Sequence, residues 1–234
     1  MFEPNIDISP VLLARKSFNQ PLLGPNPPHS YNHIATMTAS KITPSQTALF
    51  LLDYQVVHAK NSPVCAEVMS RANSIIQVAR SKGITIAHCR VAFTESEMAN
   101  IPETNAAFYQ AKSSPASAAL FLDNNPASAF HPDVLVHDGD IVVRKNRVGP
   151  FLNAPQDVNE IFRQRGINTL ILGGVATGGA VAATVVQASD LDYRLFVLED
   201  ACADADRETH EFLMKFFAKR ATVIQSRDIE SLVA

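Results

Sequence analysis

Two kinds of apolar pattern alternate along most of this chain. Short continuous apolar runs, typical of strands buried on both faces of a parallel sheet, occur at residues 47–53, 84–91, 140–145, 168–174, 193–200 and 222–225. Stretches with the spacing of an amphipathic helix occur at residues 61–82, 157–165, 177–191, 206–220 and 228–233. Strands that alternate with helices predict βαβ units, so we expect an α/β fold with a parallel sheet covered by helices on both faces. In the stretch 206–220 the pattern predicts that Phe212, Leu213, Phe216 and Phe217 point inward.

Two regions lack this alternation. Residues 1–43 are rich in Pro, Asn, Ser and Thr, and we expect a poorly ordered extension before a single domain at residues 44–234. Residues 92–140 contain Pro102, Pro115, Pro126 and Pro132 and predict mostly loop, with one short helix at residues 115–122. A loop of this length in a compact domain is usually functional or disordered.

Composition limits the classes of partner. The chain is 47% hydrophobic and 18% charged, with a formal net charge of −3, which provides no basic surface for nucleic acid or an anionic membrane. No apolar run approaches the roughly 18 residues that a membrane span needs. We therefore expect a small-molecule substrate as the partner, with no nucleic acid and no membrane.

The cysteines and the N-terminus bear on location. The three cysteines are scattered and odd in number, which favours a reducing compartment over a disulfide framework. The N-terminal segment carries Glu3 and Asp7 and only a short apolar VLLA, unlike a secretory signal. We expect a cytoplasmic protein, while export by a route without a signal peptide stays open.

Candidate chemistry gathers where the predicted strands end. Ligands of open α/β sheets bind beyond the carboxyl ends of the strands, and Asp53 ends the first predicted strand while Lys145 ends the third. A carboxyl group buried beside a cation can act as acid or base. Each residue alone also fits a simpler interpretation, a helix-capping Asp or a lysine at the surface. However, a buried Lys145 needs a partner such as Asp53, because an unpaired buried charge is costly.

The fourth predicted strand ends in a glycine-rich turn with the sequence GGVATGGA, followed by a helix. Backbone N–H groups at such a helix start lack intrahelical partners and can bind a carbonyl or an anion. The same edge of the sheet also carries Gln55, Arg90 and Phe151, and Glu199 and Asp200 end the fifth predicted strand.

The motifs LFLLDYQ, VVRKNRVGPF and GGVATGGAVAAT, in that order, resemble those of the isochorismatase-like hydrolase superfamily over about residues 46–226. The resemblance implies a three-layer α/β/α sandwich with a six-stranded parallel, Rossmann-like sheet, in agreement with the strand count above. It also implies that Asp53 is the catalytic aspartate, that Lys145 is the catalytic lysine, and that the Val175–Ala176 peptide is cis. Relatives commonly associate, so we expect a homo-oligomer, either a dimer or a tetramer.

The chain departs from the superfamily at one position. Many members carry a nucleophilic cysteine in a pattern like GVAT-x-x-C, and Ala180 stands at that place here. Cys89 and Cys202 belong to other segments, and we interpret both as buried structural thiols. The nicotinamidase-type Asp-x-His metal signature is missing, and His58 and His88, at other spacings, are interpreted as surface or core histidines. We therefore expect neither a metal nor a cofactor.

The isochorismatase branch of this superfamily has a small residue in place of the cysteine. Its substrate is an enol ether of pyruvate, which needs a proton donor rather than a protein nucleophile. By this resemblance Asp53 donates the proton, and Lys145 either orients this acid or binds a substrate oxygen. The predicted substrate-binding groups are Gln55, Arg90, Phe151, Thr177, Gly179 and Ala180, the last two through their N–H groups. Two alternatives stay open: hydrolysis of another small amide or ester by water that Asp53 and Lys145 activate, and a catalytically silent binding domain.

Overall fold

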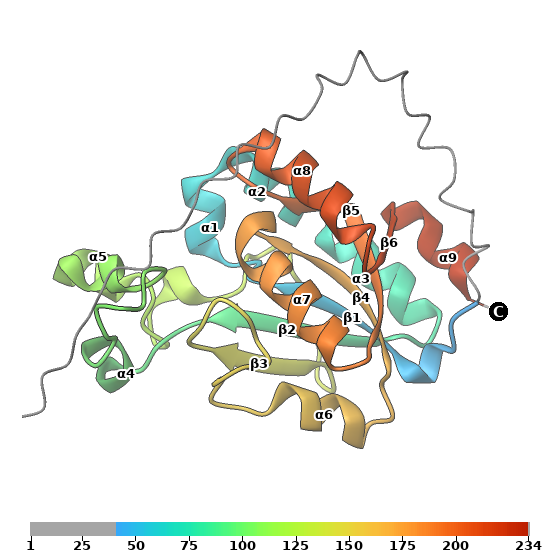
Figure 1. The fold of residues 1–234 in the computed structure, drawn as a ribbon, viewed down its shortest axis with the longest axis horizontal. Helices are drawn as coiled ribbons and strands as arrows, with labels where there is room; N and C mark the ends of the chain where they lie inside the picture. The colour runs from blue at the N-terminus through green and yellow to red at the C-terminus, as the bar shows by residue number, and fades with distance from the viewer. Residues whose placement is uncertain (1–40, 234) are drawn as a thin grey trace, which may run out of the picture. The chain divides into compact units, whose positions relative to one another are not determined.

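The computed structural model describes residues 41–233, and within them the chain forms one six-stranded sheet with the order β3-β2-β1-β4-β5-β6. All neighbouring strands pair in parallel, which confirms the predicted α/β class and parallel sheet (Figure 1). The strands are β1 (Thr47–Leu52), β2 (Thr85–Val91), β3 (Ile141–Lys145), β4 (Thr169–Val175), β5 (Arg194–Ala203) and β6 (Thr222–Ile224). Residues 1–40 of the predicted N-terminal extension lie outside the described part of the chain.

Burial along the strands explains their composition. Every residue of β1 and β4, the two central strands, is buried, because helices cover both faces of the sheet there. At the edge strand β3 burial alternates, and Val142 is 43% exposed. The core begins before the predicted domain start at residue 44, since Ile42 is buried and pairs with Val233.

Helices form a layer on each side of the sheet. They are α1 (Val56–Asn61), α2 (Pro63–Ser70), α3 (Ala72–Ser81), α4 (Glu95–Ala99), α5 (Pro115–Ala119), α6 (Val158–Gln164), α7 (Ala182–Asp190), α8 (Arg207–Phe217) and α9 (Ile229–Leu232). Shorter turns are η1 (Pro44–Gln46), η2 (Tyr109–Ser113), η3 (Pro126–Ser128), η4 (Thr177–Val181) and η5 (Ser226–Asp228). One core cluster joins the sheet to α2, α3 and α9, and the other joins it to α6, α7 and α8. The three-layer sandwich is therefore confirmed.

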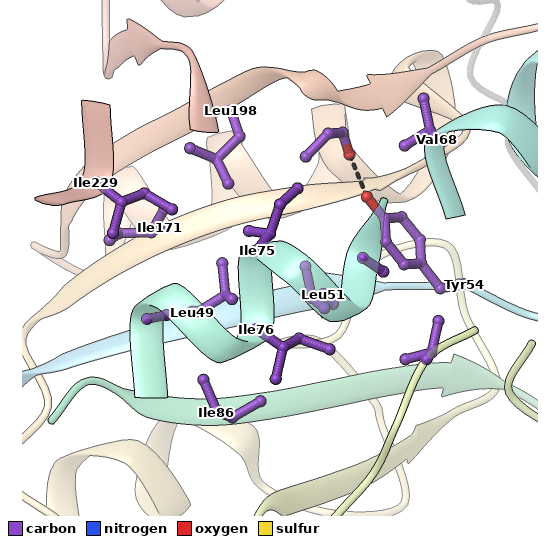
Figure 2. Packing of buried hydrophobic residues seen from close by; sticks show 14 of the residues in the cluster. Leu49, Leu51, Tyr54, Val68, Ile75, Ile76, Ile86, Ile171, Leu198 and Ile229 are labelled. Atoms are coloured by element: carbon purple, nitrogen blue, oxygen red, sulfur yellow. Dashed lines mark hydrogen bonds between the residues drawn. The ribbon is translucent and has the colours of Figure 1, made fainter. Parts of the chain in front are cut away.

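Figure 2 shows the first of these two core clusters. Ile75 and Ile76 of α3 belong to the same buried cluster as Leu49 and Leu51 of β1, and all four are labelled in Figure 2. At the edge of the cluster the hydroxyl of Tyr54 donates a hydrogen bond of 2.5 Å to the carbonyl of Ala201 (Figure 2). A buried tyrosine hydroxyl needs such a partner, and this one joins the end of β1 to β5.

The predicted helix over residues 61–82 is wrong in extent, because two helices, α2 and α3, replace it and a separate α1 precedes them. Pro63 occupies the first turn of α2, where its missing N–H removes no helical bond. Arg71 ends α2 and begins α3, with its N–H bonded to the carbonyls of Val68 and Met69. Apolar spacing continues across this break, so the pattern alone does not reveal it.

The predicted end of the fifth strand is also wrong. β5 continues past Asp200 to Ala203, and its pairing with β4 shifts between Leu172 and Gly174. The irregularity accommodates the polar residues within the strand: the carboxylate of Asp200 accepts hydrogen bonds from the N–H and hydroxyl of Ser226, at 2.8 and 2.6 Å. Polar residues here mark a bulge rather than a strand end.

The prediction for the buried face of α8 is wrong at one residue, Phe212. Met214 and Phe217 are buried and Leu213 and Phe216 pack partly against the core, but Phe212 is 66% exposed. Because the buried face of the helix is centred on Met214 and Phe217, Phe212 lies on its outer side. Among residues 41–233, no helix has the length and apolar content needed to cross a lipid bilayer.

Candidate active site

The order of the strands creates a binding edge between β1 and β4. From β1 the chain adds strands outward on one side, and from β4 it adds them on the other. In open α/β sheets a crevice for ligands forms at this point, outside the carboxyl ends of the two strands. Leu52 at the end of β1 pairs with Gly174 near the end of β4, so Asp53 leaves the sheet at this edge.

Asp53 has an unusual backbone conformation that its neighbours hold. Its φ is 58°, in the left-handed region, where aspartate and asparagine are enriched among non-glycine residues. Its N–H donates to the carbonyl of Cys89 at 2.9 Å, and its own carbonyl accepts from the N–H of Gln55 at 2.7 Å. The chain thus turns sharply after β1 and fixes where the carboxyl group starts.

Lys145 reaches that carboxyl group across a strand. β2 lies between β3 and β1, and the Nζ of Lys145 at the end of β3 lies 2.7 Å from Oδ2 of Asp53. The side chains of Lys145 and Asp53 are only 1% and 7% exposed. Lys145 also donates to the carbonyl of Val148. The structure therefore joins the two residues in a buried ion pair, for which each charge is the other's main compensation.

One oxygen of the Asp53 carboxyl group has no hydrogen-bond partner among the described residues. This atom, Oδ1, is buried. Buried carboxylate oxygens are nearly always bonded, and an exception at a binding edge of the sheet indicates a group that bonds to something else during function.

The glycine-rich turn follows β4 closely. The Val175–Ala176 peptide is cis, as the resemblance implied. A Cβ added at Gly174 would lie 2.6 Å from Cβ of Leu52 and 2.8 Å from its carbonyl oxygen, so only glycine allows β4 to lie against β1 here. The turn η4 then begins at Thr177, which is buried and bonds through Oγ1 to Nδ1 of His210 at 2.9 Å.

The N–H groups of this turn are already bonded within the protein. Gly178 donates to Oδ2 of Asp204 at 2.7 Å, and Gly179 donates to the carbonyl of Ala176 at 3.0 Å. The N–H of Gly179, which is predicted to bind substrate, therefore has a partner within the turn in this structure. The anion that a helix start attracts is here the carboxylate of Asp204, from the loop after β5.

No thiol of the chain is placed or activated for attack. Position 180 is an alanine, buried in the core cluster beside α7. All three cysteines are buried and free, which bears out the interpretation of Cys89 and Cys202 as buried thiols. Burial raises the pKa of Cys65 and Cys89, and raises that of Cys202 to about 12, so none is a thiolate near neutral pH.

Three residues predicted to bind substrate have other partners. The buried amide of Gln55 bonds to the carbonyls of Val91 and Ser128, at 2.9 and 2.7 Å, and accepts from the N–H of Val91 at 2.9 Å. Gln55 therefore ties the segment after β2 to the end of β1, and both of its amide hydrogens are used within the protein.

Arg90 and Phe151 also have other partners in the structure. Arg90 bonds to Asp123 and lines a cavity of about 440 Å³ to which neither Asp53 nor Lys145 contributes. Phe151 packs against the rings of Phe50, Phe162 and Tyr193. Among residues 41–233, the structure joins Asp53 to Lys145 and shows no hydrogen bond or ion pair from either of them to Arg90.

The sequence analysis missed the surroundings of His58. Its Nε2 atom is buried without a partner among the described residues, and the charges of both Asp53 and Lys145 act on its pKa. The only signal in the sequence is its place five positions after Asp53, which the structure turns into the first turn of α1. Within residues 41–233, no three His, Cys, Asp or Glu side chains are grouped to hold a metal ion.

Comparison with known proteins agrees with this architecture. The family profile of the isochorismatase domain matches residues 47–228. The uncharacterized isochorismatase family protein YwoC of Bacillus subtilis is 29% identical over 186 residues, which cover 79% of this chain and 92% of that protein. YecD of Escherichia coli O157:H7, also an isochorismatase family protein, is 29% identical over 184 residues, covering 77% and 92%. A cysteine hydrolase from Pseudomonas syringae pv. phaseolicola has a similar structure, with a TM-score of 0.72, 16% identity, and coverage of 82% of this chain and 94% of the other.

Proposed function

The chain belongs to the isochorismatase family, and from this premise we propose that it is a hydrolase of a small carboxylate such as isochorismate, from which it releases pyruvate. The reaction is hydrolysis of an enol ether by acid catalysis, without a covalent enzyme intermediate. The observation that supports this most is the buried Asp53–Lys145 pair with its unpartnered Oδ1, at an edge of the sheet that carries no cysteine.

The pair provides the proton that the reaction needs. Nζ of Lys145 lies 2.7 Å from Oδ2 of Asp53, close enough for a proton to pass between the two groups. When the proton resides on Asp53, the carboxyl group can donate it to the methylene carbon of the enol ether. This gives an oxocarbenium-like cation, and the carboxylate left on Asp53 lies next to it and stabilises it. Water then attacks the cation, and the resulting hemiketal separates into pyruvate and the alcohol.

The same surroundings disfavour acyl transfer. An amidase of this fold needs a nucleophile and free N–H groups for the developing oxyanion. Ala180 provides no nucleophile, and the N–H groups of Gly178 and Gly179 are bonded to Asp204 and Ala176. Enol-ether hydrolysis needs neither group.

We expect the purified protein to release pyruvate from isochorismate and Asp53→Asn to lower kcat by about 10²–10⁴-fold, the usual contribution of a general acid. Asparagine suits this test because it tolerates the left-handed φ of 58° while removing the proton donor. Coupled detection of pyruvate provides the rate.

Asp123→Asn is the matched control, since it removes a carboxylate that pairs with Arg90 outside the Asp53–Lys145 pair. We expect it to keep the wild-type rate. Absence of pyruvate release by the wild type would exclude the proposed function, and equal rates for wild type and Asp53→Asn would exclude Asp53 as the acid.

A further inference from the structure

His58 presents an unpartnered nitrogen beside the catalytic pair. It lies in the first turn of α1, where its N–H bonds to the carbonyl of Gln55 at 3.1 Å. Gln55 in turn donates its N–H to Asp53, so two short backbone bonds connect the acid to the histidine. The charges of Asp53 and Lys145 both act on the imidazole, so His58 lies within electrostatic range of the pair.

The other side of the imidazole is covered by the segment after β2. The ring of His58 lies 6.5 Å from the ring of Phe121, which packs against Phe108. Phe108 contacts Phe93, and these aromatic rings belong to a small core cluster of their own. The ring of His58 therefore contacts this apolar cluster, and its Nε2 atom is shielded from solvent.

Two buried polar atoms in this neighbourhood lack partners: Oδ1 of Asp53 and Nε2 of His58. Leaving a buried polar atom unpaired costs stability, so such atoms are rare without a functional reason. Enol-ether hydrolysis needs one group that donates a proton to carbon and another that accepts a proton from water, and these two atoms fit the two tasks.

We infer that His58 is a third catalytic residue, whose Nε2 binds the attacking water and removes its proton. The inference rests on the hydrolysis proposed above and assigns the base that this reaction lacks so far.

The protons balance over one turnover. Asp53 gives a proton to the methylene carbon, which becomes the methyl group of pyruvate. Water forms a bond to the oxocarbenium carbon and passes one proton to Nε2 of His58. As the hemiketal carbon–oxygen bond to the alcohol breaks, His58 returns that proton to the leaving oxygen, and the remaining hydroxyl proton goes to Asp53. One water is consumed, and both side chains recover their starting states.

The charges around His58 suit a base that starts neutral. Burial lowers the pKa of His58, the nearby carboxylate of Asp53 raises it, and the ammonium of Lys145 lowers it, with a net shift below 6.5. The imidazole is therefore neutral near pH 7, with a lone pair available on Nε2 in the Nδ1–H tautomer.

His58→Gln tests the role, because glutamine can bind the water but cannot take its proton. We expect kcat for isochorismate to fall by about 10²–10⁴-fold with little change in KM, and the acidic limb of the kcat/KM profile to disappear. His131→Gln is the matched control, a partly exposed histidine beside Asp133 and outside the pair, and should keep the wild-type rate and profile.

A purely structural role for His58 predicts something else. His58→Gln would then lower the rate but leave the shape of the pH profile unchanged, and that result would overturn the inference, as would a fully active variant. If His58→Gln does not fold, His58→Ala is assayed instead, with imidazole added to the reaction. The inference predicts that kcat recovers as the concentration of imidazole base increases. A kcat that does not recover contradicts the inference.

The two proposals fail in different ways. A wild-type protein that releases no pyruvate contradicts the proposed function, and with it the role of His58. A wild type that depends on Asp53 but not on His58 leaves the proposed function intact and overturns only the inference about the base.

Discussion

At the scale of single residues, His88 is a buried titratable group far from bulk solvent. It is fully buried in β2, with Nε2 3.3 Å from Oδ2 of Asp140 and its ring 5.5 Å from that of Phe130. Arg80 holds the same carboxylate with two bonds of 2.8 and 3.0 Å. Burial lowers the pKa of His88, Asp140 opposes that shift, and the charges of Arg80 and His137 add to it.

This arrangement predicts a loss of stability in mild acid. Because the pKa of His88 is below 6.5 when folded and near 6.5 when unfolded, the unfolded state binds more protons as the pH falls through 6.5. We expect the free energy of unfolding, measured with urea, to decrease from pH 7.5 to pH 5.5, and His88→Gln to make this dependence shallower.

His131→Gln, at a partly exposed histidine, should leave the slope unchanged. A free energy of unfolding that stays constant over the same pH range, or an equally steep dependence in His88→Gln, would contradict the account of His88.

The residues of the site were predictable to different degrees. Asp53 and Lys145 stand out in the sequence because each is a charge that ends an apolar run. The sequence does not reveal that Asp204 accepts the hydrogen bond of the Gly178 N–H, because Asp204 lies in a loop 26 residues away. The environment of His58 depends on Lys145 from β3 and Phe121 from the long segment after β2. Contacts of this kind arise from tertiary packing and leave no spacing pattern in the chain.

At the scale of elements, the close packing of β4 against β1 depends on Gly174. A side chain there would meet Leu52 at 2.6 Å, a distance that real Cβ atoms do not reach, whereas a side chain at Gly179 would meet no atom within 4 Å. The two glycines of one turn therefore have different structural roles.

Alanine substitutions should separate the two. We expect Gly174→Ala to lower the free energy of unfolding by about 1–3 kcal/mol through overpacking. Gly179→Ala should leave it unchanged or raise it slightly, because alanine is the better helix former. Thermal unfolding of both variants checks this, and equal losses at the two positions would show that the close approach at Gly174 is not what constrains the turn.

Element boundaries were the less predictable part of the fold. Continuous apolar runs identified the strands, because strands buried on both faces need them. The break at Arg71 and the bulge near Asp200 went undetected, since apolar spacing continues through the first and the second resembles a strand end. Local caps and pairing shifts decide both features.

At the scale of the whole molecule, the order of the strands determines which side chains meet at the site. Successive strands are added to one side of β1 and then, from β4 on, to the other side. At this point of the sheet Lys145 extends past β2 and contacts Asp53. The class of fold follows from the alternation of strands and helices, but the order of the strands is fixed only when the sheet assembles. The central claim is that the carboxyl group brought to this edge protonates carbon.

A single-turnover comparison in H2O and D2O tests that claim most directly. With enzyme in excess over isochorismate, proton transfer from Asp53 to the methylene carbon limits the rate, so pyruvate should form more slowly in D2O and carry one deuterium in its methyl group. Asp53→Asn should reduce the rate in both solvents. Equal single-turnover rates in H2O and D2O for the wild-type protein would contradict rate-limiting proton donation by Asp53.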